Sequence, residues 1–161
     1  MGWLRRWRRE GELWCNLCGQ QMVLETIPLL SGAAGQVEVI FRSLPLLACP
    51  NEDHPHRFAS ADFGVYVIDA VFWRGQVPLG RPGTLARVKC GKCGKNLSKE
   101  PVRSSEVAGL LNITGLPEFG IRIKGPVTTC PRCQTDQLWA SKEIGRDVSS
   151  AMVEAFKAAG L

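Results

Sequence analysis

The sequence predicts an α+β protein that contains two similar modules in tandem, each with a small antiparallel β-sheet followed by one helix. Three observations lead to this prediction. Six of the seven cysteines occur in Cys-x-x-Cys pairs, segments with strand-like alternation separate the pairs, and a helical pattern follows the last pair. Each half of the 161-residue chain has only about 80 residues. A domain of that size buries a thin core and commonly needs a bound metal or disulfides.

An internal repeat supports the tandem arrangement. A shift of 81 residues aligns Pro45 and Cys49 with Pro126 and Cys130. The Cys-x-x-Cys-Gly segments near the start of each copy align at a shift of 75, so the second copy has six additional residues between its two cysteine segments. One module used twice explains these matches. We expect an N-terminal arm over 1–12, a zinc-ribbon-like module over 13–73, a linker over 74–86 and a second zinc-ribbon-like module over 87–161.

Each copy contains two segments with the pattern of strands. Residues 37–41 and 121–124 alternate between apolar and polar side chains, as strands with one buried face do. The run Ser-Gly-Ala-Ala-Gly at 31–35 is predicted to be a hairpin loop, because small and glycine-rich runs between strands mark turns. The expected strands are 22–30 and 37–47 in the first copy, and 99–107 and 120–129 in the second.

A helix is predicted near the end of each copy. In the second copy Ser141 can cap the helix and Gly160 can end it. The apolar residues between them recur at helical spacing and comprise Ile144, Val148, Met152, Ala155 and Ala159. The segment 60–73 of the first copy is predicted to be helical only by analogy, because Val65-Tyr66-Val67-Ile68 alone favours a strand.

The cysteines of the second copy predict a zinc site. Cys90, Cys93, Cys130 and Cys133 form a four-cysteine pattern, and Zn²⁺ prefers four tetrahedral ligands with thiolates among the best. The glycine that follows the first pair permits a tight turn around the ion. Redox-active dithiols and an iron–sulfur centre are the alternatives for such a set.

The first copy predicts a second zinc site with an inferred ligand. Cys15, Cys18 and Cys49 supply three thiolates, but Glu52 stands where the second copy has its fourth cysteine. We expect His54 to be the fourth ligand, with His56 as the alternative. Both ions are expected to be structural. A water molecule in place of histidine would instead give the open geometry of a catalytic zinc.

More than half of the net positive charge of the chain lies at the start of the N-terminal arm. The net charge is +5, of which +3 lies in the first ten residues. The arm combines two tryptophans with four arginines, namely Trp3, Arg5, Arg6, Trp7, Arg8 and Arg9. Arginine with aromatics can contact nucleic acid, anchor a protein partner, lie at a membrane surface, or pack on its own protein. We expect a membrane role least.

The cellular environment can be anticipated from the same sequence. The odd number of cysteines argues against a closed disulfide framework, and the start of the chain lacks the apolar segment of a secretory signal. We therefore expect a cytoplasmic protein whose thiols are reduced.

Each copy resembles the YgiT-type zinc finger, which is the N-terminal module of the MqsA antitoxin family. The resemblance is carried by Cys-x-x-Cys, a two-strand segment, a proline before the third ligand, Cys-Pro-x-Cys and a following helix. In the second copy these residues are Cys90, Cys93, Pro126, Cys130, Pro131 and Cys133; in the first they are Cys15, Cys18, Pro45, Cys49 and Pro50. The resemblance implies a structural zinc module that presents a surface to a protein partner. It does not imply DNA binding by a helix-turn-helix, because no such segment follows the second helix.

No catalytic set can be recognised in the sequence, since a phosphate-binding loop, a nucleophile elbow and a His-Glu-x-x-His helix are all missing. We therefore expect a non-catalytic zinc protein that acts as an adaptor, accessory subunit or regulator through protein–protein interaction. The alternatives are a nucleic-acid-binding module that uses the arm, and an enzyme with an open three-cysteine zinc at the first site.

Overall fold

The computed structural model describes residues 14–15, 17–53, 57–58, 67–71, 76–82, 87–112, 117–139 and 141–160. The N-terminal arm and both histidines, His54 and His56, lie outside these ranges. The predictions made for them are therefore not addressed by the fold.

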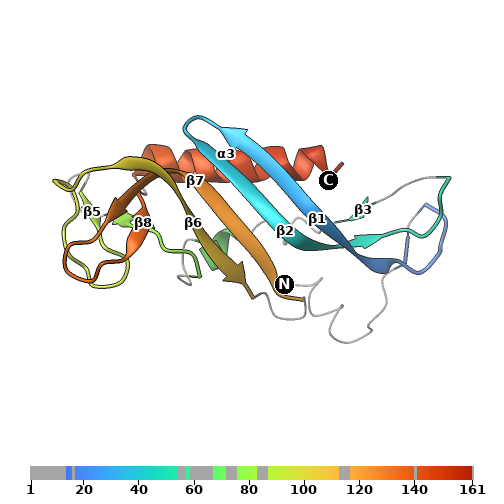
Figure 1. The fold of residues 1–161 in the computed structure, drawn as a ribbon. Coiled ribbons are helices and arrows are strands. Elements are labelled where there is room, and N and C mark those ends of the chain that lie inside the picture. The colour runs from blue at the N-terminus through green and yellow to red at the C-terminus, as the bar shows by residue number, and fades with distance from the viewer. Residues whose placement is uncertain are drawn as a thin grey trace.

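The main element is one antiparallel sheet in the strand order β1-β2-β7-β6. These strands are β1 (Val23–Ala34), β2 (Val37–Ala48), β6 (Arg103–Leu111) and β7 (Phe119–Thr129). Two short strands extend the sheet, β3 (Arg57–Phe58) on β2 and β8 (Asp136–Leu138) on β7. A separate pair is formed by β4 (Arg81–Pro82) and β5 (Val88–Lys89), and one long helix, α3 (Lys142–Ala158), lies along a face of the main sheet (Figure 1).

The sheet is continuous across the two halves of the chain. β2 pairs directly with β7, from Glu38 opposite Lys124 to Arg42 opposite Gly120. The predicted α+β class with antiparallel strands and a C-terminal helix is confirmed. The prediction of two modules with a small sheet each is not confirmed, because the strands of both halves share one sheet and one hydrophobic core.

The two hairpins nevertheless pair in equivalent registers. Thr26 faces Pro45 in the first hairpin, and Ser104 faces Pro126 in the second. The first strands of the two hairpins are thus offset by 78 residues and the second strands by 81. Three of the six additional residues of the second half therefore fall between its strands, where a longer connection replaces the two-residue turn of the first hairpin.

The small-residue run after Leu30 is part of a strand, which corrects the predicted hairpin loop. Residues 31–34 continue β1, and the turn is only Gly35 and Gln36. One of these small residues, Gly32, is required by α3. A Cβ atom on Gly32 would lie 2.2 Å from the carbonyl oxygen of Ala151 and 2.3 Å from the amide nitrogen of Ala155. Glycine here serves a close approach of helix to strand.

Helix α3 forms as predicted and covers the first hairpin. The Ser141 hydroxyl accepts a hydrogen bond from the Ile144 amide at 3.3 Å, which caps the helix. The predicted apolar positions are all buried, and the helix packs mainly on β1 and to a lesser extent on β2. Phe41 of β2 stacks on Phe156 of the helix with ring centroids 5.5 Å apart. A helix from the second half thus completes the core of the first.

The segments that precede the second half also join this core. Residues 67–71 are helical, in agreement with the described part of the predicted first helix, and Val67, Ala70 and Val71 are buried. In the segment expected to be a linker, Val77 and Leu79 are buried, and Leu79 forms a bridge with Leu138 of β8. The described part of this segment therefore packs on the body of the protein.

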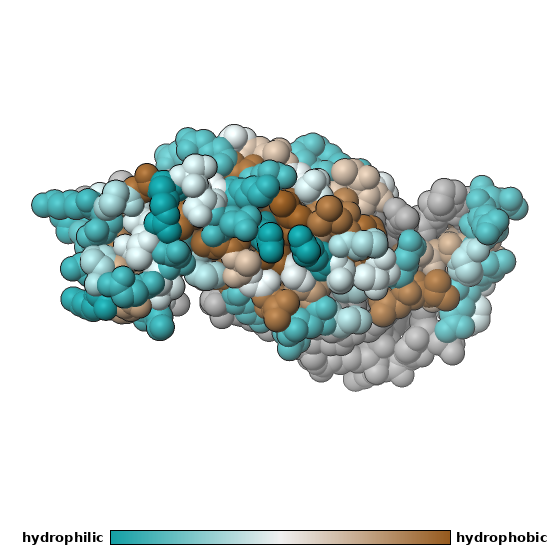
Figure 2. Space-filling view, in the orientation of Figure 1, coloured by the Kyte–Doolittle hydropathy of each residue, from teal (hydrophilic) through white to brown (hydrophobic). Residues whose placement is uncertain are grey.

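The opposite face of the sheet carries charged and apolar side chains. Glu38 and Lys124 form an ion pair there, as do Arg122 and Glu106. In Figure 2, which shows this face, hydrophobic side chains run along the sheet with hydrophilic ones among them. Within the described ranges no helix has the length and apolar character needed to cross a membrane.

Candidate metal centre

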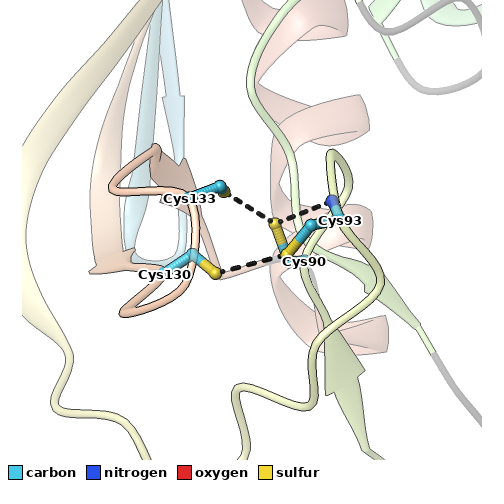
Figure 3. A group of neighbouring side chains, drawn as sticks. All are labelled: Cys90, Cys93, Cys130 and Cys133. Atoms are coloured by element: carbon cyan, nitrogen blue, oxygen red, sulfur yellow. Dashed lines mark hydrogen bonds between the residues drawn. The ribbon is translucent and has the colours of Figure 1, made fainter.

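Four cysteines from two turns point toward one another beside β5 and β8 (Figure 3). Cys90 and Cys93 follow β5, whereas Cys130 and Cys133 follow β7. The sulfur atoms of Cys90 and Cys133 are 3.6 Å apart, as are those of Cys93 and Cys130. All four sulfurs lie within 4.8 Å of one another, and none is in a disulfide.

This arrangement has the dimensions of a tetrahedral metal site. Four sulfurs at about 2.3 Å from a central ion lie about 3.8 Å apart. The two short sulfur–sulfur distances match that value closely, and both are far too long for a disulfide bond of about 2.05 Å. The predicted grouping of Cys90, Cys93, Cys130 and Cys133 is therefore present without any rearrangement, and the group could hold a metal ion.

The two turns share one backbone geometry. The Cys90 amide donates to the Lys95 carbonyl at 2.7 Å, and the Gly94 amide donates to the Cys90 carbonyl at 3.0 Å. In the second turn the Cys130 amide donates to the Thr135 carbonyl at 3.0 Å, and the Gln134 amide donates to the Cys130 carbonyl at 2.8 Å. The fifth residue of each turn has a positive φ, +78° at Gly94 and +60° at Gln134. Glycine adopts this conformation without strain, whereas glutamine does not.

Three N–H groups converge on the sulfur of Cys90. The amides of Lys92 and Cys93 each lie 3.4 Å from it, and the side-chain amide of Gln137 lies 2.9 Å from it. Burial alone raises the pKa of Cys90, but these hydrogen bonds outweigh burial and lower the pKa to about 6. A thiolate at neutral pH is the form that binds a metal.

The other ligands of this group differ in their environment. A hydrogen bond from the Lys95 amide lowers the pKa of Cys93, but burial and the sulfurs around it raise the pKa to about 11. The pKa of Cys133 is lowered, chiefly by the hydroxyl of Thr135. Four thiols that share one small volume cannot all ionise without a cation, so the site is chemically suited to one.

Gln137 was not anticipated from the sequence. Its side chain is 1 % exposed, donates to Cys90 and accepts a hydrogen bond from the Gly91 amide at 2.7 Å. It therefore links β8, beside the second turn, to the first turn. A glutamine is ordinarily a surface residue, and nothing in the sequence near Gln137 indicates a partner 47 residues away.

The first predicted site contains three cysteines among the described residues. Cys15, Cys18 and Cys49 have sulfurs within 4.8 Å of one another, with Cys18 and Cys49 at 3.4 Å. Cys15 begins a turn with the geometry of the Cys90 turn, and Gly19 supplies the positive φ of +71°. The group could hold a metal ion with a further ligand, and the predicted His54 and His56 lie outside the described ranges.

The turn that begins at Cys49 differs from the other three. Asp53 donates its amide to the side-chain oxygen of Asn51 at 3.0 Å, and Glu52 replaces the second cysteine. Burial is the main cause that raises the pKa of Cys49, with contributions from the neighbouring thiols of Cys18 and Cys15. The described part of this group therefore offers three cysteines rather than four.

The two cysteine groups lie at opposite ends of the main sheet. The first group lies where β1 begins and β2 ends, with Val23 opposite Ala48. The second lies where β7 ends and β6 begins, with Arg103 opposite Val127. Because β2 and β7 run antiparallel, these two positions face away from each other, as the places of β3 and β8 in Figure 1 show.

Comparisons with known proteins add no family to these observations. No family model, curated protein or solved structure matches the chain. The resemblance to the YgiT-type zinc finger therefore stays a prediction.

Proposed function

We propose that this chain is a non-catalytic zinc protein that holds two structural ions and acts by binding other macromolecules. The observation that carries the proposal is the convergence of Cys90, Cys93, Cys130 and Cys133 at tetrahedral distances. Four thiolates favour zinc over the hard cations. With all four positions taken by protein sulfurs, no position is left for a substrate, so we assign this ion a structural role.

In the four-cysteine site, the fourth ligand, Cys133, lies at a fixed sequence distance from the short strand β8. Asp136 pairs with Thr129, the residue immediately before Cys130. Cys133 lies three residues before Asp136. The fourth ligand of this site thus precedes the first residue of the short strand by three positions.

The pairing of β3 gives the same relation in the first half. Arg57 pairs with Ala48, the residue immediately before Cys49. The residue three positions before Arg57 is His54. His54 therefore corresponds to Cys133 in its sequence distance from the short strand, and imidazole nitrogen is a common zinc ligand beside three thiolates. This correspondence supports His54 rather than His56 as the fourth ligand.

An adaptor or regulator role is supported by the uncovered face of the sheet. Leu29 is 60 % exposed on β1 and Leu110 is 61 % exposed on β6. The two are joined across the sheet by one row of paired residues, through Arg42 and Gly120. Exposed leucines beside small and charged side chains suit a protein partner. The resemblance to an antitoxin module is in line with such a role.

Metal content tests the zinc assignment. We expect elemental mass spectrometry of the purified chain to find two zinc ions, and His54→Ala to retain about one. His56→Ala is the matched control and should retain two. A wild-type chain without zinc would refute the proposal. Loss of zinc in His56→Ala alone would transfer the ligand role to His56, and two ions in both variants would favour a water ligand and hence the enzyme alternative.

A comparative pull-down tests the binding role. Leu29→Glu with Leu110→Glu should abolish recovery of proteins that the wild-type chain retains. Val153→Glu, on the exposed side of α3 at 48 % exposure, is the matched control. Equal recovery by the wild type, the double variant and the control would contradict a partner on this face.

A further inference from the structure

Basic residues gather around the four-cysteine group. Lys89 precedes Cys90, and Lys92 and Lys95 lie within and just after the same turn. Arg132 lies between Cys130 and Cys133 in the opposite turn, and the set is completed by two flanking residues, Arg87 and Lys99. We call these six residues the basic tip. Five of them are exposed and Lys95 is half-buried.

Within the described ranges, the charges of the basic tip are not neutralised by ion pairs. None of its six side chains forms an ion pair in the described part of the chain, whereas the neighbouring Arg103 is bound to Asp136 at 3.0 Å. Zinc with four thiolates carries a net charge of about −2, and Glu100 adds one negative charge. The six basic side chains exceed these charges, so the described residues at this end carry a net positive charge.

The described charged residues at the other end of the sheet are mainly acidic. The described residues 14–15, 17–25, 44–53 and 57–58 contain three acidic residues, Glu25, Glu52 and Asp53, and one basic residue, Arg57. Among the described residues, basic side chains therefore gather at the second cysteine group and not at the first. Hairpins with equivalent registers do not require this difference, so the basic tip needs an explanation other than the fold.

We propose that the basic tip binds the phosphate backbone of duplex nucleic acid. This inference rests on the proposed function, because a zinc-loaded site would hold the two turns that carry the tip. Lysine ammonium groups serve as point charges for phosphates. The Lys92 amide already bonds to the Cys90 sulfur, so the backbone that carries this lysine is fixed by the site.

A nucleic acid explains the composition of the tip better than a protein partner does. Protein interfaces are enriched in aromatic residues and depleted in lysine. Segments 87–100 and 130–138 contain four lysines, and the aromatic residue that follows them, Trp139, is half-buried against the cysteine group. Because Trp139 packs inward, the described part of the tip presents no exposed aromatic side chain for stacking on unpaired bases, so it suits the backbone of a duplex and reads no sequence. The binding is separate from the Arg/Trp arm.

Fluorescence anisotropy with the full-length, zinc-loaded chain tests the proposal. The probe is a labelled DNA duplex of about 20 base pairs, titrated between about 50 and 200 mM NaCl. We expect affinity to fall steeply with salt and to depend little on base sequence. In a plot of the logarithm of the association constant against the logarithm of the salt concentration, the slope should be roughly −0.9 for each phosphate contacted. Lys92→Glu with Arg132→Glu should weaken binding at least tenfold.

Two further variants locate the binding surface. Lys142→Glu with Arg146→Glu places the same charge change on exposed positions of α3 and should stay within threefold of the wild type. The arm variant, with alanine at Arg5, Arg6, Arg8 and Arg9, should also keep most of the affinity. The tip variant should retain its zinc, so a failure of this inference is distinct from a failure of the zinc assignment.

Several outcomes would overturn the proposal. Wild-type affinity in the tip variant, or loss of binding in the arm variant alone, would remove the tip from the interface. Absence of duplex binding at the lowest salt concentration would do the same. Polyglutamate that competes as well as unlabelled duplex, at equal charge concentration, would assign the tip to an acidic protein surface instead.

Discussion

Replacing Gln137 should weaken metal binding at one site and leave the other unchanged. Its side-chain amide donates to the Cys90 sulfur at 2.9 Å in a fully buried position. A hydrogen bond to a charged group contributes about 1.5–3 kcal/mol. With each 1.4 kcal/mol equal to about a factor of ten, Gln137→Leu should lower zinc affinity by about 10- to 150-fold. Gln137→Glu should be more severe, because a carboxylate would face the thiolate.

The assay is zinc competition against a chromophoric chelator, with the cobalt-substituted protein as a spectroscopic check. The first cysteine group lies at the far end of the sheet and serves as an internal control. Gln21→Leu, at an exposed position, is the control for loss of a glutamine. A Gln137→Leu protein that binds zinc at the second site within threefold of the wild type would refute the reasoning.

Three further predictions concern the fold. Gly32→Ala should destabilise the protein by about 3 kcal/mol, because its Cβ would strike the backbone of α3. Gly145 lies in α3 with open space around it, so Gly145→Ala should stabilise the folded protein by up to about 1 kcal/mol. Equal midpoints of urea unfolding for the two variants would contradict the close approach of Gly32 to the helix. Gln134→Gly should relieve the strain of a φ of +60° and raise the free energy of unfolding by about 0.5–1 kcal/mol. Gly94→Ala should introduce such strain and lower the free energy of unfolding by about 1 kcal/mol. Thermal unfolding should show a higher midpoint for the first variant and a lower midpoint for the second. The Thr129 hydroxyl and Arg103 lower the pKa of Asp136, so its charge stabilises the folded state above about pH 4 and this contribution is lost as the pH falls through the lowered value. The stability difference between wild type and Asp136→Asn should therefore be constant from about pH 5 to 8 and shrink in acid, and a difference that grows in acid would contradict the assignment.

Local patterns were sufficient for the helix and the cysteine groups. Ser141, the apolar stripe and Gly160 define α3 within a few residues, because capping and periodicity are local properties. The four-cysteine group was predictable because metal geometry fixes ligand type and spacing. The strands were placed within a few residues for the same local reason.

Long-range contacts account for what the sequence did not reveal. The alternation of β2 and β7 is the same whether they end in two sheets or pair with each other, so the single sheet could not be foreseen. Gly32 looked like part of a loop because the helix that requires it lies about 120 residues later. The burial of Gln137 likewise depends on Cys90, a partner on another turn.

The packing of α3 on the first hairpin has a consequence for biosynthesis. The inner face of β1 and β2 carries Leu30, Val39 and Phe41, and it is covered by a helix that ends at Ala158. At about 5–20 residues per second, a ribosome takes about 5–20 s to proceed from the end of β2 to the end of that helix. During this interval the nascent hairpin presents an apolar surface that its own chain cannot yet cover. Translation that stalls before residue 142 would leave a product prone to aggregation, and such intermediates are clients of chaperones that bind exposed strands.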